Sequence, residues 1–92
     1  MASIEVTVVD AVGLHARPAA LFVRLAKTFE SKIVVRKGER EANAKSILRV
    51  LTLEAQQGDV LQIDADGEDA DEAVQRLHDL LAGGVDANPS TA

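Results

Sequence analysis

The segment Gly13-Leu14-His15-Ala16-Arg17-Pro18-Ala19 marks the change from one kind of secondary structure to another. Before it, residues 4–9 (Ile-Glu-Val-Thr-Val-Val) alternate like a strand with one buried face. After it, apolar residues recur at helical spacing over residues 16–29, and Pro18 stands in the first turn, where its missing N–H costs nothing. The fold is therefore predicted to begin as strand, loop and helix, with His15 at the helix start.

Two side chains of this segment suit phosphate chemistry. The first N–H groups of a helix lack intrahelical acceptors, and the peptide dipoles place about half a positive charge there. An anion is favoured at such a helix start, and the guanidinium of Arg17 offers a planar pair of donors to phosphate oxygens. This arrangement predicts that His15 is a nucleophile beside an anion-binding helix start. The alternative is that His15 only caps the helix and that Arg17 faces water.

The composition is that of one small globular domain. The chain has 92 residues, of which 47% are apolar, and it contains no Cys, which excludes a disulfide framework and a thiolate metal site. It has no signal-peptide pattern, and no apolar run approaches the roughly 20 residues that span a bilayer. We therefore expect a soluble cytoplasmic protein without membrane contact.

The net charge of −5 is unevenly distributed. Residues 1–49 contain nine Lys or Arg and five Asp or Glu, whereas residues 50–92 contain one basic and ten acidic residues. This asymmetry suggests a basic face that attracts acidic partners, although an ordinary solvated surface is the alternative. Nucleic acid is a poor candidate partner, because the chain is acidic overall and its aromatic residues are only Phe22 and Phe29.

The rest of the pattern predicts an α+β domain. The further segments are strands at 32–36, 40–43 and 60–65, and helices at 47–53 and 69–82. The order β-α-β-β-α-β-α favours a four-stranded sheet with its helices on one side. Asp69 with Glu72 resembles a capping box at the last helix. Residues 1–84 form the predicted domain, and residues 85–92 are predicted to be a mobile tail.

No metal site and no cofactor are expected. The acidic stretch 64–69 superficially suggests calcium, but the twelfth position of an EF-hand loop counted from Asp64 falls on Gln75, not on a glutamate. His78 lies on the last predicted helix, without a second histidine or clustered carboxylates at a metal-binding spacing. Both are read as structural or surface features.

The His15 segment resembles the active-site motif of the HPr family, the histidine-containing phosphocarrier proteins of the bacterial phosphoenolpyruvate:sugar phosphotransferase system. A second segment, Ala44-Lys45-Ser46-Ile47-Leu48, resembles the serine region of the family, and the resemblance extends from Ile4 to about Ala82. It implies an open-faced β-sandwich in which three helices cover one face of a four-stranded antiparallel sheet. It also implies a stoichiometric phosphoryl carrier rather than a turnover enzyme, with a monomer as the family default.

The resemblance assigns roles to individual residues. His15 would accept a phosphoryl group on Nδ1 from phosphorylated enzyme I and pass it to IIA domains of sugar permeases, with Arg17 as the phosphate clamp. For Ile47 and Leu51, burial in the core is the competing interpretation. The docking surface for both partners would comprise Ala16, Ala20, Arg24, Lys27, Ile47, Leu48 and Leu51.

Ser46 has two compatible interpretations. As a helix N-cap, its hydroxyl would stabilise the short helix by about 1 kcal/mol. In many relatives the matching serine is phosphorylated by HPr kinase/phosphorylase, and negative charge there would oppose acidic partners. Arg49 replaces a frequent glycine of the family pattern, which weakens the expectation for such a kinase, and Val12 replaces a common small polar residue.

Three other functions stay open at this point. The chain could be a regulatory binding module that acts through Ser46 or through direct docking. It could also relay phosphate in a nitrogen-related branch of the system or to a dihydroxyacetone kinase. A plain structural α/β domain is the residual interpretation, which the His15 segment disfavours.

Overall fold

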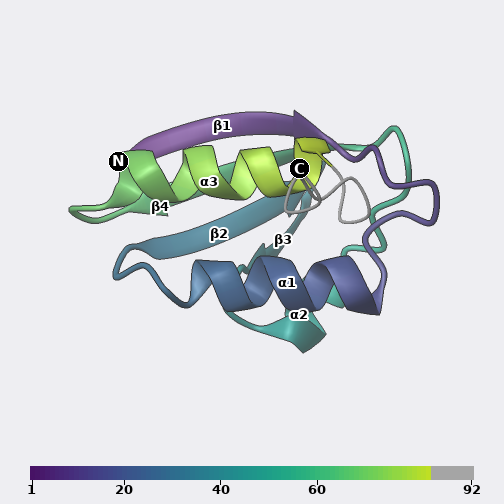
Figure 1. Ribbon diagram of the computed structural model, residues 1–92, viewed down its shortest axis with the longest axis horizontal. Helices are drawn as coiled ribbons and strands as arrows, with labels where there is room; N and C mark the ends of the chain where they lie inside the picture. The colour runs from purple at the N-terminus through teal and green to yellow at the C-terminus, as the bar shows by residue number, and fades with distance from the viewer. Residues whose placement is uncertain (84–92) are drawn as a thin grey trace, which may run out of the picture.

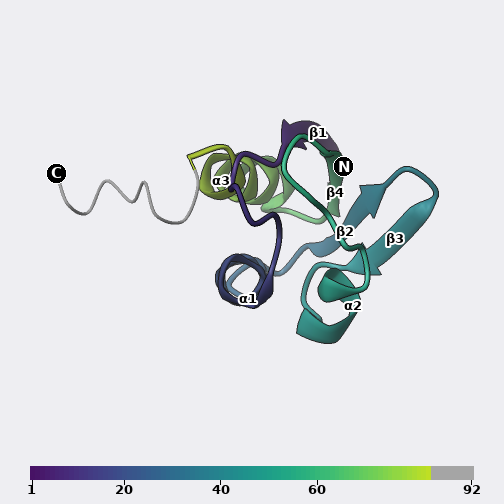
Figure 2. The ribbon, with the colours of Figure 1, turned by 90° about the vertical axis from the view of Figure 1, so that its right-hand side faces the viewer.

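The computed structural model describes residues 1–83 as a four-stranded sheet whose helices lie on one face (Figures 1 and 2). The predicted element order and the open-faced antiparallel sheet are confirmed, with strands arranged β1-β4-β2-β3. The predicted tail, 85–92, lies outside the described residues. The elements are β1 (Ala2–Thr7), α1 (Ala16–Ala26), β2 (Lys32–Lys37), β3 (Arg40–Asn43), α2 (Ile47–Leu51), β4 (Val60–Asp66) and α3 (Ala70–Gly83).

The core lies between the sheet and the helices. Ile63 of β4 pairs with Ile4 of β1 on one side and with Val35 of β2 on the other, and its side chain is fully buried. The residues before and after it in β4 point to the open face of the sheet. Phe22 of α1 and Leu77 of α3 cover the same region and are fully buried. Because burial of one such side chain contributes about 1.5–3 kcal/mol, the alternation of the strands decides which face receives the helices.

β1 is displaced by two residues from the predicted 4–9 and ends at Thr7. Val8 nevertheless continues the pairing with the segment before β4. Its N–H donates to the Asp59 carbonyl at 2.9 Å, and its carbonyl accepts from the N–H of Gly58 at 2.9 Å. The first strand thus leads directly into the loop that carries His15.

The sequence pattern overestimates α1 by three residues and α2 by two. A threonine marks both helix ends. The hydroxyl of Thr28 donates to the Leu25 carbonyl at 2.7 Å, and that of Thr52 donates to the Arg49 carbonyl at 2.5 Å. In each case the threonine N–H donates to the same carbonyl, three residues back, so the chain tightens and leaves the helix.

Asp69 joins the start of α3 to the connection between α1 and β2. Asp69 directly precedes α3, as the predicted capping box requires, and its carbonyl accepts from the Ala73 N–H at 2.9 Å. Its carboxylate accepts from outside the helix: from the N–H of Glu30 at 2.8 Å, from the N–H of Ser31 at 3.0 Å and from the Ser31 hydroxyl. Ser31 is only 1% exposed. A Cβ on Gly67 would lie 2.5 Å from the Ser31 Oγ, so the two loops can approach this closely only because residue 67 is glycine.

This contact makes the stability of the protein dependent on pH. The Ser31 hydroxyl, followed by the backbone N–H groups, holds the pKa of Asp69 below its ordinary value of 3.8. The native state therefore binds fewer protons than the unfolded state. The stabilisation is present above pH 3.8 and is lost as the pH falls through the lowered pKa.

We expect Asp69→Asn to lower the free energy of unfolding at neutral pH, because the amide replaces one of two oxygens that accept from three donors. The difference from the wild type should shrink as the pH falls from 3.8 through the lowered pKa of Asp69, since the carboxylate is protonated in both states only below that pKa. Urea unfolding across this range measures it. Glu68→Gln, which removes the same charge from an exposed neighbour, is the control and should show a much smaller difference. Equal effects of the two variants would contradict the role of Asp69.

Candidate functional site

His15 is the N-cap of α1, but its side chain does not cap the helix. Its backbone is extended (φ −87°, ψ −171°), and its carbonyl accepts from the Ala19 N–H at 2.9 Å. The ring makes no capping hydrogen bond and is 39% exposed. The imidazole therefore takes no part in capping and is available at the surface beside the first N–H groups of the helix.

The loop before α1 is held by a close backbone approach. Gly13 has φ +83°, and a Cβ placed there would lie 2.6 Å from the carbonyl oxygen of Ala55. The next N–H, of Leu14, donates to this same oxygen at 2.8 Å, and the Leu14 side chain is buried. Residue 13 must therefore be glycine for the loop to lie on the segment before β4, and that contact places His15.

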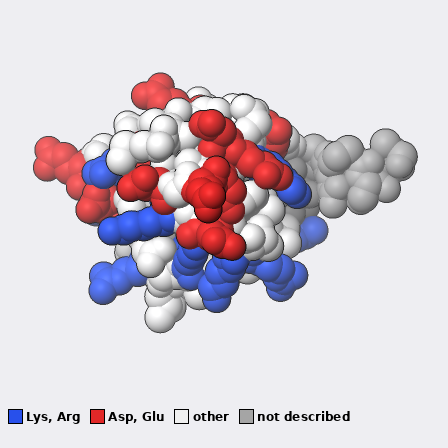
Figure 3. Space-filling view, turned by 90° about the vertical axis from the view of Figure 1, so that its left-hand side faces the viewer, with Lys and Arg blue, Asp and Glu red and all other residues white. Residues whose placement is uncertain are grey.

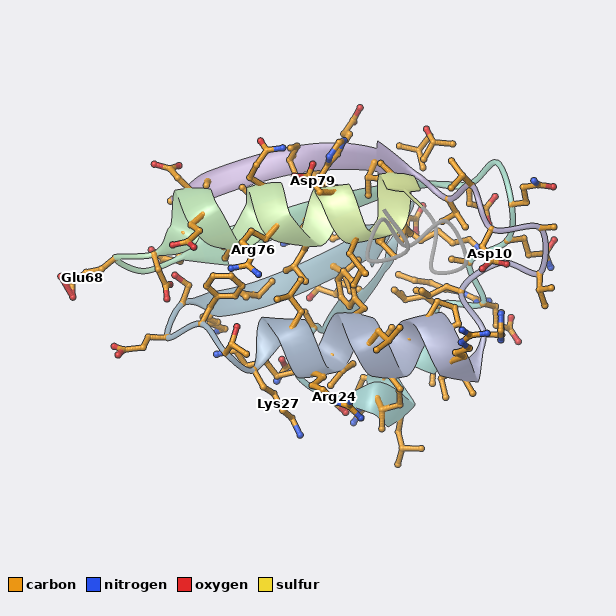
Figure 4. The ribbon with its side chains drawn as sticks, viewed as in Figure 1. Asp10, Arg24, Lys27, Glu68, Arg76 and Asp79 are labelled. Carbon is orange, nitrogen blue, oxygen red and sulfur yellow. The ribbon has the colours of Figure 1, made fainter. Side chains whose placement is uncertain are left out.

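Asp10 is the carboxylate beside His15. Its Oδ1 lies 3.9 Å from His15 Nε2 and accepts the Val12 N–H at 2.9 Å, and its carbonyl accepts from Gly13 at 2.9 Å. Figure 4 shows Asp10 in the loop at the start of α1. No role was assigned to Asp10 from the sequence. An Asp three residues before a Gly is a turn signal, which would have indicated its position in the loop but not its distance from the ring.

Arg17 and the basic residues of α1 lie on the exposed side of the helix. Arg17 is the second helical residue, two positions after His15. Arg24 lies in the last turn of α1 and Lys27 is its C-cap, and both are exposed (Figure 4). The structure thus brings the predicted clamp and the predicted docking cations onto the helix that begins at His15.

A hollow of about 200 Å³ lies between α1 and α2, and we call it the α1–α2 groove. Its lining includes four of the predicted docking residues and Val23, a buried residue of α1 that was not among them. The burial of Val23 in the core does not by itself indicate that this residue also lines a hollow at the surface. The lining residues are Ala20, Val23, Arg24, Lys27 and Ile47.

The remaining docking residues differ in exposure. Leu48 is 74% exposed and Ala16 is exposed, whereas Ile47 and Leu51 are half-buried and pack against the core. The core interpretation of Ile47 and Leu51 therefore holds for part of each side chain, and their role in docking stays a prediction. Val12, at 71% exposure in the loop before His15, is a further apolar surface residue that was not assigned to the docking surface.

Ser46 is the N-cap of α2, as predicted. Its Oγ accepts from the backbone N–H of Arg49 at 3.4 Å, and its side chain is half-buried. The hydroxyl lies at the start of the helix that forms one wall of the α1–α2 groove. Within residues 1–83, no group of three or more His, Cys, Asp or Glu side chains is placed to hold a metal ion.

Charge separates along the molecule. Figure 3 shows Lys and Arg side chains gathered on the side of α1 and α2, with Asp and Glu side chains above them, on the side of α3. The basic residues around α1 and α2 are Arg17, Arg24, Lys27, Lys45 and Arg49, and all but the half-buried Lys45 are exposed. The predicted basic face is confirmed as a structural feature, and the groove lies on it.

A family model described as the PTS HPr component phosphorylation site matches residues 2–83. The chain belongs to the HPr family. The phosphocarrier protein HPr of Haemophilus influenzae is 47% identical over 81 residues, which cover 88% of this chain and 95% of that protein. HPr proteins are phosphocarriers of the phosphotransferase system rather than enzymes, in agreement with the prediction.

Solved HPr structures have the same fold. That of HPr-C-His from Thermoanaerobacter tengcongensis superposes with a TM-score of 0.87 at 42% identity, covering 90% of this chain and 93% of that one. A structure described as an HPr dimer from the same organism gives a TM-score of 0.69 at 44% identity, covering 87% and 92%. Among the described residues of this HPr protein, no helix has the length and apolar character needed to cross a membrane.

Gly13→Ala should destabilise the protein more than a glycine substitution that meets only backbone strain. We expect a loss of about 3 kcal/mol, because a left-handed conformation and a clash with the Ala55 carbonyl add together. Gly58→Ala is the matched control: its φ is +94°, but nothing lies within 4 Å of the added Cβ, so it should cost about 1–2 kcal/mol. Denaturant unfolding measures both, and equal losses would show that the close approach is unimportant.

Proposed function

We propose that His15 accepts a phosphoryl group on Nδ1 from phosphorylated enzyme I and passes it to IIA domains of sugar permeases. The observation that carries the proposal is the surface-exposed imidazole, without a capping hydrogen bond, at the start of an 11-residue helix in a chain of the HPr family. A ring in this position can reach a phosphorylated partner without any movement of the fold.

The chemistry follows from the surroundings of the ring. As Nδ1 bonds to phosphorus, the bond from phosphorus to the donor breaks and its electron pair leaves with the donor. Charge on the transferring oxygens is stabilised by the helix N-terminus and by Arg17, two residues from His15. Few donors act here, so the phosphoryl group is held weakly enough to be passed on.

The α1–α2 groove and the apolar residues beside it supply the proposed docking surface. Exposed Leu48 and half-buried Ile47 offer apolar contact, and Arg24 and Lys27 surround it with positive charge. A carrier that meets two partners in turn needs rapid association and rapid release. A small contact guided by charge meets both needs better than a large apolar one.

His15→Ala should abolish phosphorylation. With phosphoenolpyruvate, magnesium and enzyme I, the wild type should gain one acid-labile phosphate, measured by intact-protein mass spectrometry before and after acid treatment. His78→Ala removes the other histidine, on α3, and should be phosphorylated like the wild type. Retention of the phosphate by His15→Ala would refute the assignment.

Arg24→Glu should slow phosphoryl transfer from enzyme I by about three- to tenfold at low salt, since it reverses a charge on the docking surface. The difference should diminish as the salt concentration rises. Lys32→Glu makes the same charge change on the open face of the sheet and is the control. Stopped-flow or quenched-flow transfer rates test this, and a similar loss in both variants would argue against docking at the groove.

We propose Ser46 as a regulatory site, to be modified by a kinase of the HPr kinase/phosphorylase type. Its hydroxyl lies at the start of α2, and α2 forms one wall of the α1–α2 groove. A phosphate on this hydroxyl would therefore place negative charge beside the cations that are proposed to attract the partners. In the same transfer assay, Ser46→Asp adds a charge while keeping a good N-cap residue, and it should slow transfer. Ser46→Ala, which lacks the charge, should transfer at the wild-type rate.

The carrier acts as a monomer in the cytoplasm in this proposal. His15, Arg17 and the groove all lie on one chain and around one helix, so no second copy is needed to complete the site. The HPr dimer of Thermoanaerobacter tengcongensis shows the alternative state, and sedimentation at working concentrations distinguishes the two for this chain.

A further inference from the structure

We propose that Asp10 is a positioning residue for His15: its carboxylate keeps the proton of the neutral imidazole on Nε2 and so leaves Nδ1 as the nucleophile. This inference rests on the proposed phosphorylation of His15 and adds the choice of ring nitrogen. It goes beyond the sequence motif, which begins at Gly13 and does not include Asp10.

One carboxylate oxygen of Asp10 lies near one ring nitrogen of His15. Asp10 Oδ1 lies 3.9 Å from His15 Nε2, within the range of an ion pair although longer than a hydrogen bond. The same oxygen is fixed by the Val12 N–H at 2.9 Å, and the Asp10 carbonyl is fixed by the Gly13 N–H. The carboxylate is therefore held in place by its own loop and does not depend on His15 for its orientation.

The surroundings strengthen this interaction. The Asp10 side chain is only 16% exposed, compared with 39% for His15. Asp10 borders a cleft of about 10 Å³. The other lining residues are largely apolar and include Leu14, Pro18 and Leu80 of α3. A charge pair at such a position is less screened by water than one on an open surface.

The proton balance shows what the carboxylate does. A neutral imidazole carries one proton, and a negative charge near Nε2 favours the form with the proton there. The lone pair on Nδ1 then forms the bond to phosphorus while the donor takes the electron pair of the bond that breaks. Nε2 keeps its proton throughout, the ring gains positive charge, and that charge develops opposite Asp10. Transfer to the next acceptor reverses these changes.

Asp10→Asn is the decisive variant. The amide oxygen can still accept the Val12 N–H, so the turn is retained, but the negative charge is lost. We expect the fraction of neutral imidazole with its proton on Nε2 to fall, as read from the ¹⁵N shifts of the ring nitrogens at alkaline pH. We also expect phosphorylation by enzyme I to slow by about fivefold, as for the loss of a partly exposed ion pair.

Glu68→Gln removes one negative charge at the far end of the molecule from Asp10 (Figure 4) and should leave both readouts unchanged. If Asp10→Asn keeps the wild-type tautomer ratio, the proposal is overturned, even if phosphorylation slows, because the loss then comes from the loop structure. The tautomer is measured without phosphate, so this result stands apart from the proposed function. Failure of His15 to accept phosphate in the wild type would refute the function and leave the tautomer measurement to decide the role of Asp10.

Discussion

The contact between Gly13 and the carbonyl of Ala55 is the constraint on which the site depends. No side chain fits at residue 13, and the adjoining N–H of Leu14 takes the same carbonyl as its acceptor. The loop after β1 is thereby attached to the segment before β4, which is itself anchored in the middle of the sheet. These backbone contacts place His15 at the start of α1, where its ring is exposed at the surface.

α1 is held at both ends by contacts with the rest of the domain. At its N-terminus the Gly13 loop contacts residue 55, and just beyond its C-terminus Ser31 and its backbone are bound by the Asp69 carboxylate. Between these points Phe22 packs into the core while Arg24 faces the solvent. The helix thus presents the imidazole at its start and the exposed cations Arg24 and Lys27 towards its end.

The distribution of charge suits a carrier. Arg24 and Lys27 line the groove on the side of α1 and α2, and on the face shown in Figure 3 the Asp and Glu side chains gather above the Lys and Arg side chains. In the proposed function, this charge attracts a phosphorylated partner to the face that carries His15, and a small apolar contact allows rapid release. Ser46 is the N-cap of α2 beside this surface, which is why a phosphate there is proposed to oppose docking.

The sequence by itself determined the element order, the inward face of each strand and the position of His15 at a helix start, because the alternation of side chains and helical spacing are local properties. Its family motif also indicated Arg17 and Ser46. Only the tertiary structure decided that the Asp69 carboxylate binds Ser31, that Val23 reaches the groove, and that Asp10 lies near His15 Nε2. These contacts depend on how separate loops approach one another, and a pattern of neighbours along the chain carries no measure of that distance.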